Sequence, residues 1–384
     1  MLPVETIQSA QSKCRARAQL REATLADYCQ VAALQIRNGF EPYSPAQWTR
    51  YWRDNPAFRL APCSWPIGWV LETNNRDIVG WMGNILTAYQ FRGQWLFAAS
   101  PSSWVVDRTH RGFGWKLLNR MLQQKNIDLF IASNISSVSE PFAGHVGFSK
   151  VPVGQWDLSE FWITNHRGFA KVILEKEYVP AARLAAWLVS AGLHGWSLLK
   201  KDHVVRRRHS PFEVAPCSSF DGRFDRFWEN LQNENEDVLL AARSKEILEW
   251  HFRPGLNDGN VWVLTSSQGN RLTAYAIFDR QDNPLNALRR VRLVDFQCAK
   301  GAEKTVVSAL GWMLEYCQQQ QIHVLEVNGS WLRRRRLPRI AAPYERKMPS
   351  WRFYYKAVDQ AISVALNRAQ AWAPSSFDGD ASLC

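Results

Sequence analysis

The sequence lacks the cysteine spacing of a metal-binding or disulfide-bonded protein. Its seven cysteines include no Cys-x-x-Cys pair, and no histidine is spaced to complete a zinc site with them; they stand at positions 14, 29, 63, 217, 298, 317 and 384. An odd number of scattered cysteines is typical of reduced thiols in a cytosolic protein. We therefore expect a cytoplasmic protein with neither a disulfide framework nor a metal site.

The sequence also leads us to expect neither a secretory signal nor a membrane-spanning segment. The N-terminal residues contain no hydrophobic stretch followed by a cleavage site. Leu184–Leu199 runs for sixteen residues without a charge, but a spanning helix needs about 20. We predict a buried or bridging helix between domains. The alternative is a helix on an anionic membrane surface, with contact through Leu184–Arg208 that would make the protein peripheral to the inner membrane face.

The basic charge is not spread over the whole chain. The formal net charge is +12, yet Lys200–His209 holds five basic residues and one acid, and Arg333–Lys347 holds seven and one. These two clusters carry +10 of the total, so the rest of the chain is almost balanced. Basic clusters can contact phosphates, anionic lipid or nucleic acid. Because no RNA-recognition motif is visible, we rank nucleic acid third.

The composition is that of a soluble globular protein. The chain has 384 residues, of which 46% are hydrophobic and 21% charged, values that exclude a disordered chain. At about 150 residues per domain, two to three domains are expected.

Strand and helix patterns alternate through the first 175 residues. The order is a strand, two helices, three strands, a helix, a strand, a helix and a last strand. The predicted ranges are 19–23, 25–37, 45–54, 67–72, 78–88, 95–106, 114–125, 128–132, a helix ending at 146, and 147–153. This order indicates an α/β fold with one mixed sheet flanked by helices.

The second half repeats this plan more loosely. Trp52–Pro56 and Trp250–Pro254 both end a helical run, and similar strands, turns and a helix follow each in the same order. Five matching segments indicate an internal duplication. We predict a first domain over 1–175, an interdomain helix and basic linker over 176–210, a degenerate second copy over 211–370, and a flexible tail over 371–384.

The most informative segment is Val105–Leu122, in which a strand runs into the turn His110–Gly114 at the start of a helix. Backbone N–H groups there and the positive end of the helix dipole suit a phosphate or pyrophosphate. Gly112 and Gly114 let the main chain approach a ligand and adopt conformations forbidden to other residues. An ordinary tight turn is the alternative.

This turn resembles the pyrophosphate loop of the GCN5-related N-acetyltransferases, Arg/Gln-x-x-Gly-x-Gly/Ala, although Lys116 stands where Gly or Ala is usual. The resemblance covers roughly residues 19–155 and includes Gly147-Phe148 at the last strand. It implies an acetyl-CoA or other acyl-CoA cofactor. The implied binding residues are Val105, Val106, Arg111, Gly112, Phe113, Gly114, Trp115, Lys116 and Asn134.

The proton-transfer group is less clear. Ala143 stands where the family often has the tyrosine that protonates the departing CoA thiolate. Either another residue moves the proton, or this copy binds a ligand without turnover. Glu140, His145 and His110 are candidates, because a histidine or a carboxyl of raised pKa can accept a proton near neutral pH. The alternative for each is a solvated helix residue or a histidine at the edge of the core.

The second copy has lost the loop. Lys300-Gly301-Ala302-Glu303 lacks the second glycine and adds an acid, which disfavours pyrophosphate. One intact and one degenerate copy, together with the two Trp-x-x-x-Pro segments, resemble bacterial polysaccharide-assembly proteins and, more distantly, FemAB-type aminoacyl transferases.

Together these features predict two tandem GCN5-related domains that move an acyl group from acyl-CoA to an amine or hydroxyl of a sugar or cell-envelope precursor. Several of the nineteen tryptophans could stack on sugar faces, although core packing is the alternative for most; those nearest the expected cleft are Trp69, Trp81, Trp95, Trp104 and Trp262. The alternative functions are a CoA-binding scaffold without turnover and, third, a nucleic-acid binder.

Overall fold

The computed structural model describes residues 18–137, 139–178, 182–199, 213–283, 287–333, 337 and 340–383. It divides into two compact units that are discontinuous in sequence. Of the described residues, the first comprises 18–53, Pro66–Ile85 and Pro101–Lys125, and the second comprises the remaining segments. Two long strands, β3 (Ile78–Phe91) and β4 (Gln94–Val106), each contribute to both units.

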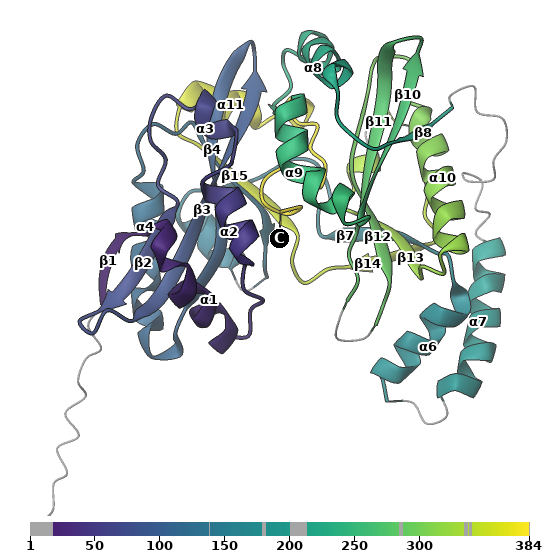
Figure 1. Cartoon of the computed structure of the whole chain (residues 1–384), viewed down its shortest axis with the longest axis horizontal. Helices are drawn as coiled ribbons and strands as arrows, with labels where there is room; N and C mark the ends of the chain where they lie inside the picture. Colours follow the sequence, from purple (N-terminus) through teal and green to yellow (C-terminus); the bar gives the residue numbers. More distant parts are fainter. Residues whose placement is uncertain are drawn as a thin grey trace, which may run out of the picture. The chain divides into compact units, whose positions relative to one another are not determined.

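The first unit follows the predicted order of elements closely (Figure 1). Ser44 caps one of its helices and Pro45 occupies the first helical position, as the sequence predicts, while the Gln47 side chain accepts from the Ser44 N–H in return. The unit contains β1 (Ala18–Glu22), α1 (Tyr28–Arg37), α2 (Pro45–Trp52), β2 (Gly68–Thr73), parts of β3 and β4, and α4 (Gly114–Leu122).

The core of the first unit is aromatic. Trp52 lies edge-on to Trp81 with ring centroids 5.5 Å apart, and both rings are buried. Gly83 allows this packing, because a Cβ atom there would lie 2.9 Å from the Ser102 carbonyl oxygen and 3.0 Å from the Trp52 ring. Trp69 and Trp81 are thus core residues, which removes them from the predicted sugar-stacking set.

The second unit contains strands of two sheets. An eight-stranded sheet of the described residues has the order β1-β2-β3-β4-β5-β15-β6, with β9 paired to β3. Its members in this unit include β5 (Leu129–Ile135), β15 (Arg352–Ala357), β6 (Ser149–Lys150) and β9 (Leu240–Ala241), accompanied by α3 (Ala57–Leu60), α5 (Glu140–His145) and α11 (Gln360–Leu366). The predicted last strand, 147–153, is only two residues long here.

The other sheet, within the same described ranges, has seven strands in the order β14-β7-β13-β12-β11-β10-β8. These are β14 (Tyr344–Lys347), β7 (Leu158–Ile163), β13 (Val324–Asn328), β12 (Arg290–Cys298), β11 (Arg271–Arg280), β10 (Val261–Gln268) and β8 (Ala215–Cys217). Helices α8 (Gly222–Glu234), α9 (Lys245–Asn257) and α10 (Thr305–Gln319) accompany it (Figure 1). Two mixed sheets flanked by helices confirm the predicted fold class.

The two sheets exchange strands. β7 lies before residue 175 but pairs with β13 and β14, whereas β15 lies near the C-terminus but pairs with β5 and β6. That the first domain ends at residue 175 and the second begins at residue 211 stays a prediction. The helix pair α6 (His166–Lys176) and α7 (Ala182–Leu199) joins β7 to β8, two strands of one sheet.

The C-terminal segment 371–384, predicted as a flexible tail, is largely buried where the structure describes it. Trp372, Phe377 and Leu383 are buried, and so are the polar residues Ser375 and Asp378. The apolar side chains supply the packing and a network of hydrogen bonds satisfies the polar ones. The segment is part of the core of the second unit.

Candidate functional site

The predicted cofactor loop borders a cavity of about 260 Å³ in the first unit. Two elements form it, the end of β4 and the turn η2 (Arg108–Phe113) that leads into α4. Its lining comprises Asn38, Phe40, Trp104, Val105, Val106, Arg111 and Gly114. The structure therefore brings four of the predicted binding residues together at one cavity.

The end of β4 is fixed to the end of α1 by Asp107. Arg37 donates to this carboxylate through Nε and Nη2 at 2.9 and 2.7 Å, and Asn38 Nδ2 donates at 2.8 Å. Burial alone would raise the pKa of Asp107, but these hydrogen bonds outweigh it and hold the pKa below its ordinary value. These contacts tie the end of β4 to the end of α1 next to the cavity, and they compensate the charge of Asp107.

Of the two loop glycines, only Gly114 lies close to other side chains, since a Cβ atom at Gly112 would meet nothing within 4 Å. Contrary to the prediction, neither Gly112 nor Gly114 has a positive φ. A Cβ atom at Gly114 would lie 3.5 Å from Val106 and 3.7 Å from the Trp104 ring, so any longer side chain would project into the cavity wall. Glycine at 114 keeps this space open for a ligand.

The residues present fit an anionic ligand such as a pyrophosphate. Arg111 lines the cavity and is exposed, and it makes no ion pair with the residues that the structure describes. The N-terminus of α4 adds the positive end of a helix dipole. Lys116, the unusual residue of the loop, folds back so that its Nζ lies 4.7 Å from the centre of the Phe113 ring.

Five predicted binding residues lie apart from the cavity lining: Gly112, Phe113, Trp115, Lys116 and Asn134. Phe113 and Trp115 flank Gly114, and the Trp115 side chain is 60% exposed. Asn134 lies on β5 in the second unit and is exposed. β5 pairs in parallel with β4 at Ala98 and Ala99.

The predicted catalytic residues are spread over the two units. Glu140 accepts from Arg352 Nε at 2.6 Å and from the Tyr354 hydroxyl at 2.8 Å, so it ties α5 to β15. Burial, followed by this contact with Glu140, raises the pKa of Tyr354 to about 12. Glu140 is thus engaged in an ion pair with Arg352, whereas a general base needs a carboxylate that is free to accept a proton.

The two histidines are peripheral. His145 is exposed at the end of α5, with Nδ1 2.6 Å from the Pro141 carbonyl oxygen. His110 lies in the turn, with Nδ1 3.0 Å from the Thr109 hydroxyl. Ala143 is buried and, as expected, offers no proton.

The loop of the second copy is blocked by carboxylates. The Gly301 N–H donates to Glu303 Oε1 at 3.0 Å, and the Lys300 N–H donates to Glu234 Oε2 at 3.2 Å. These two amides already donate to carboxylates; that this copy does not hold a pyrophosphate stays a prediction. Of the basic run at Arg333, residues 334–336 lie outside the described residues, as does the cluster at 200–209.

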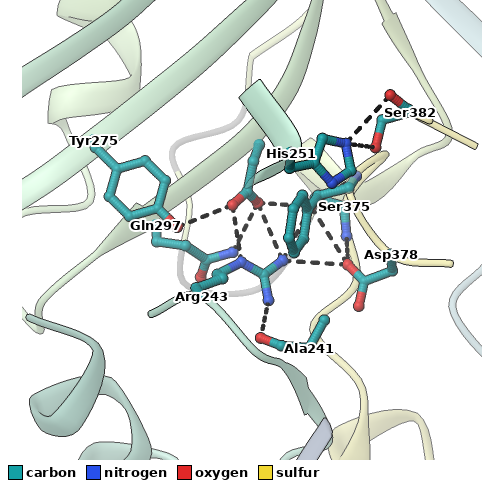
Figure 2. A network of polar contacts seen from close by, with 10 residues as sticks. Ala241, Arg243, His251, Tyr275, Gln297, Ser375, Asp378 and Ser382 are labelled. Carbon is teal, nitrogen blue, oxygen red and sulfur yellow. Dashed lines mark hydrogen bonds and ion pairs between the residues drawn. The ribbon is translucent and has the colours of Figure 1, made fainter. Parts of the chain in front are cut away.

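A buried polar network in the second unit was not predicted (Figure 2). Arg243 donates to Asp295 at 2.8 Å through Nε and to Asp378 at 3.3 Å through Nη2. Ser375 and Tyr275 donate to the same Asp295 carboxylate. An uncharged Ser-Ser-Phe followed by Asp-Gly-Asp looks like a loop in the sequence, and only the buried partner Arg243 reveals its role.

No group of His, Cys, Asp or Glu among the described residues is arranged to hold a metal ion. None of the helices in the described ranges combines the length and apolar character needed to cross a bilayer.

Comparison with known proteins gives the fold. No family model and no curated protein matches the sequence. Similar solved structures include a GCN5-related N-acetyltransferase from Anabaena variabilis, with 12% sequence identity and a TM-score of 0.53 over 89% of this chain and 73% of that chain. A second is the GCN5-related N-acetyltransferase from Kribbella flavida, with 12% identity and a TM-score of 0.52 over 90% of this chain and 72% of that chain. A third is the Saccharomyces cerevisiae N-myristoyltransferase with bound myristoyl-CoA, with 10% identity and a TM-score of 0.50 over 88% of this chain and 79% of that chain. The fold is that of the GCN5-related acyltransferases. At sequence identities of 10–12% this similarity shows the fold alone, so any statement about the reaction has to be argued from the residues of the site.

Proposed function

We propose that the protein is an acyltransferase that uses acetyl-CoA or another acyl-CoA as its acyl donor. The observation that carries this proposal is the cavity at the end of β4, where Arg111 and Gly114 face an open space in a fold of this class. Acyl-CoA supplies the thioester. The protein holds the pyrophosphate at Arg111 and the start of α4.

The reaction we propose is direct attack by the acceptor on the thioester carbonyl. The main chain at Val105 or Val106, at the end of β4, donates a hydrogen bond to the carbonyl oxygen as negative charge develops there. Alignment of donor and acceptor supplies most of the remaining acceleration, and no covalent enzyme intermediate is needed.

We propose an amine or hydroxyl of a sugar or cell-envelope precursor as the acceptor. Trp104 supports this class, because its ring lines the cavity and an aromatic face can stack on a sugar. Residues 1–175 would then form the donor-binding copy, and 211–370 a copy with a structural or acceptor-binding role.

We also propose a peripheral contact with the inner membrane face through Leu184–Arg208. On α7, the side chains of Leu188, Trp187 and Trp196 are 80%, 60% and 50% exposed. Exposed apolar side chains in a cluster mark an interaction surface, and the basic residues from Lys200 onward in the sequence suit anionic lipid.

A second candidate function is a scaffold that binds CoA without turnover. It is favoured by Ala143 and by the ion pair that engages Glu140. It predicts acyl-CoA binding with no thiol release on any amino-sugar acceptor.

The proposed donor site is tested by titrating acetyl-CoA against wild type and Gly114→Glu. Glutamate would fill the space beside Trp104 and place a negative charge against the pyrophosphate. We expect about 100-fold weaker binding or worse, because like charges at an interface cost several kcal/mol. Gly222→Glu is the matched control: it adds the same side chain at the exposed first position of another helix, α8. Equal affinity of Gly114→Glu and Gly222→Glu would remove the loop from the donor site.

A further inference from the structure

Trp104 carries a side-chain N–H without a partner in the wall of the cavity at the end of β4. The residue lies on β4 and lines the cavity in the first unit. Its Nε1 atom is buried and meets no hydrogen-bond acceptor among the described residues. An indole N–H can only donate, and a buried N–H without an acceptor costs the folded state free energy. A ligand oxygen beside this atom would remove that cost.

The N–H lies next to Gly114, the first residue of α4. A Cβ atom built on Gly114 would lie 3.8 Å from Trp104 Nε1 and 3.5 Å from Val106, and both are ordinary van der Waals distances. Space for an atom therefore exists beside the indole N–H. The positive end of the α4 dipole acts at the same place, because the helix begins at this glycine.

The other polar side chains of the cavity lining narrow the choice of ligand atom. Asn38 has two N–H bonds on Nδ2, and both are engaged, one by the Leu34 carbonyl at 2.9 Å and one by Asp107 at 2.8 Å. Among the described side chains that line the cavity, Arg111 and Trp104 are therefore the N–H groups left for a ligand. A cation beside an N–H that can only donate suits an oxygen with negative charge.

The position of Trp104 distinguishes it from the core tryptophans. Trp52, Trp69 and Trp81 of the same unit also have Nε1 atoms that are buried without an acceptor among the described residues. None of these three lines the cavity, whereas Trp104 does. A ligand in the cavity would therefore meet the N–H of Trp104 and not those of the aromatic core.

We propose that Trp104 Nε1 donates a hydrogen bond to a pyrophosphate oxygen of the acyl donor, beside Arg111. The contact uses the edge of the indole ring and leaves its face for the stacking proposed above. An acyl donor without phosphate groups would not make this contact, so the site selects CoA thioesters over pantetheine thioesters. This inference rests on the acyltransferase function proposed above and adds a binding residue to its donor site.

The first measurement follows the indole N–H signals of the full chain by 1H–15N NMR. The chain has nineteen tryptophans, and the signal that is absent from Trp104→Phe identifies Trp104. We expect acetyl-CoA, and separately an excess of inorganic pyrophosphate, to move this proton downfield, because a hydrogen bond to an anion forms. S-acetylpantetheine has the thioester but no phosphate, and it should leave the signal in place.

The second measurement compares affinities by calorimetric titration of wild type, Trp104→Phe and Trp69→Phe. Phenylalanine keeps an aromatic ring and removes the N–H. Trp69 is the matched control, because its Nε1 is also buried without an acceptor in the described part of the chain but does not line the cavity. We expect Trp104→Phe to bind acetyl-CoA about tenfold more weakly or worse and S-acetylpantetheine as the wild type does. Trp69→Phe should match the wild type for both.

The outcomes separate this inference from the proposed function. Acetyl-CoA bound by the wild type without a downfield shift of the Trp104 signal would overturn the inference and leave the donor site intact. A shift with S-acetylpantetheine but not with pyrophosphate would do the same, since the accepting oxygen would then belong to the pantetheine arm. If Trp104→Phe does not fold, the wild-type spectra still decide, because an indole proton must move with both acetyl-CoA and pyrophosphate. Failure of the wild type to bind acetyl-CoA would overturn the inference and the proposed function together.

Discussion

Two aspartates of the C-terminal tail show how differently the same side chain behaves in one short segment. Asp378 lies against the Arg243 guanidinium, and its charge is compensated by that contact. Asp380 lies two residues away and is buried, and among the described side chains its donor is the Ser133 hydroxyl. Ionising Asp380 therefore costs the folded state free energy that ionising a solvated aspartate would not.

This cost makes a prediction for stability against pH. The pKa of Asp380 is raised by burial from 3.8 to about 6, so the folded state binds more protons than the unfolded state between these values. Stability is fully present below the unfolded pKa and falls as pH rises toward 6, by about 3 kcal/mol in all. Asp380→Asn removes the ionisable group.

This effect is measured by urea unfolding at pH 4, where the folded-state Asp380 is protonated, and at pH 7.5, where it is ionised. We expect Asp380→Asn to match the wild type at the acid condition and to exceed its free energy of unfolding by up to about 3 kcal/mol at the neutral one. A difference that is the same at both pH values would show that Asp380 titrates normally.

For single residues, the sequence predicts which side chains can bind or react better than it predicts which distant residues will surround them. The Arg111–Gly114 motif led to the cavity because the backbone of a strand-to-helix turn is local. The sequence places Glu140 and His145 on one helix, but it gives no sign of Arg352, which ion-pairs with Glu140 from a strand more than 200 residues later. Asp380 was missed for the same reason, since its burial depends on β5.

The helix α7 stands out among the elements because its apolar side chains face outward. Leu188, Trp187 and Val189 are 80%, 60% and 40% exposed. Arg167 of α6 lies over the Trp187 ring, with its guanidinium carbon 4.5 Å from the ring centre. A tryptophan beside a basic group is typical of the interfacial region of a membrane.

Membrane contact by α7 is tested with vesicles. We expect the wild type to co-sediment with vesicles containing phosphatidylglycerol more than with neutral ones, and Leu188→Glu to bind about tenfold more weakly, because it loses apolar burial and adds a repelled charge. Val364→Glu on α11 is the control, since Val364 is also an exposed apolar helix residue, 56% exposed. If both variants bind as the wild type does, or the wild type binds neither kind of vesicle, α7 is not the contact.

Most elements were predictable because their signals are local. The helix start at Ser44-Pro45 and the paired strands β2 and β3 agree with the expected ranges. The short β6 was overestimated, because the glycine and apolar residues of 147–153 resemble a strand although only Ser149 and Lys150 pair. The partner decides the length of an edge strand, and the partner is β15.

At the scale of the whole molecule, the exchange of β7 and β15 could not be read from the sequence. Duplicated patterns predict two copies, each complete in itself, and nothing local tells a strand which sheet to join. β7 pairs with β13, more than 150 residues away, and β15 pairs with β5, more than 200 away.

The exchange predicts that the halves depend on each other. Expressed alone, residues 1–175 lack β15 and leave β5 and β6 without their shared partner, while residues 211–384 lack β7 between β13 and β14. We expect each half to be insoluble and co-expression to restore a soluble pair, assayed by co-purification through a tag on one half. Two independently soluble halves with cooperative unfolding would contradict this.

The late pairing of β15 also bears on synthesis of the chain. While the ribosome adds the residues after β5, that strand has an edge open to other chains until Arg352–Ala357 emerges. At about 5–20 residues per second, this interval lasts on the order of ten seconds or more. Nascent chains of this protein should therefore need chaperone protection longer than a protein of equal length with two self-contained sheets.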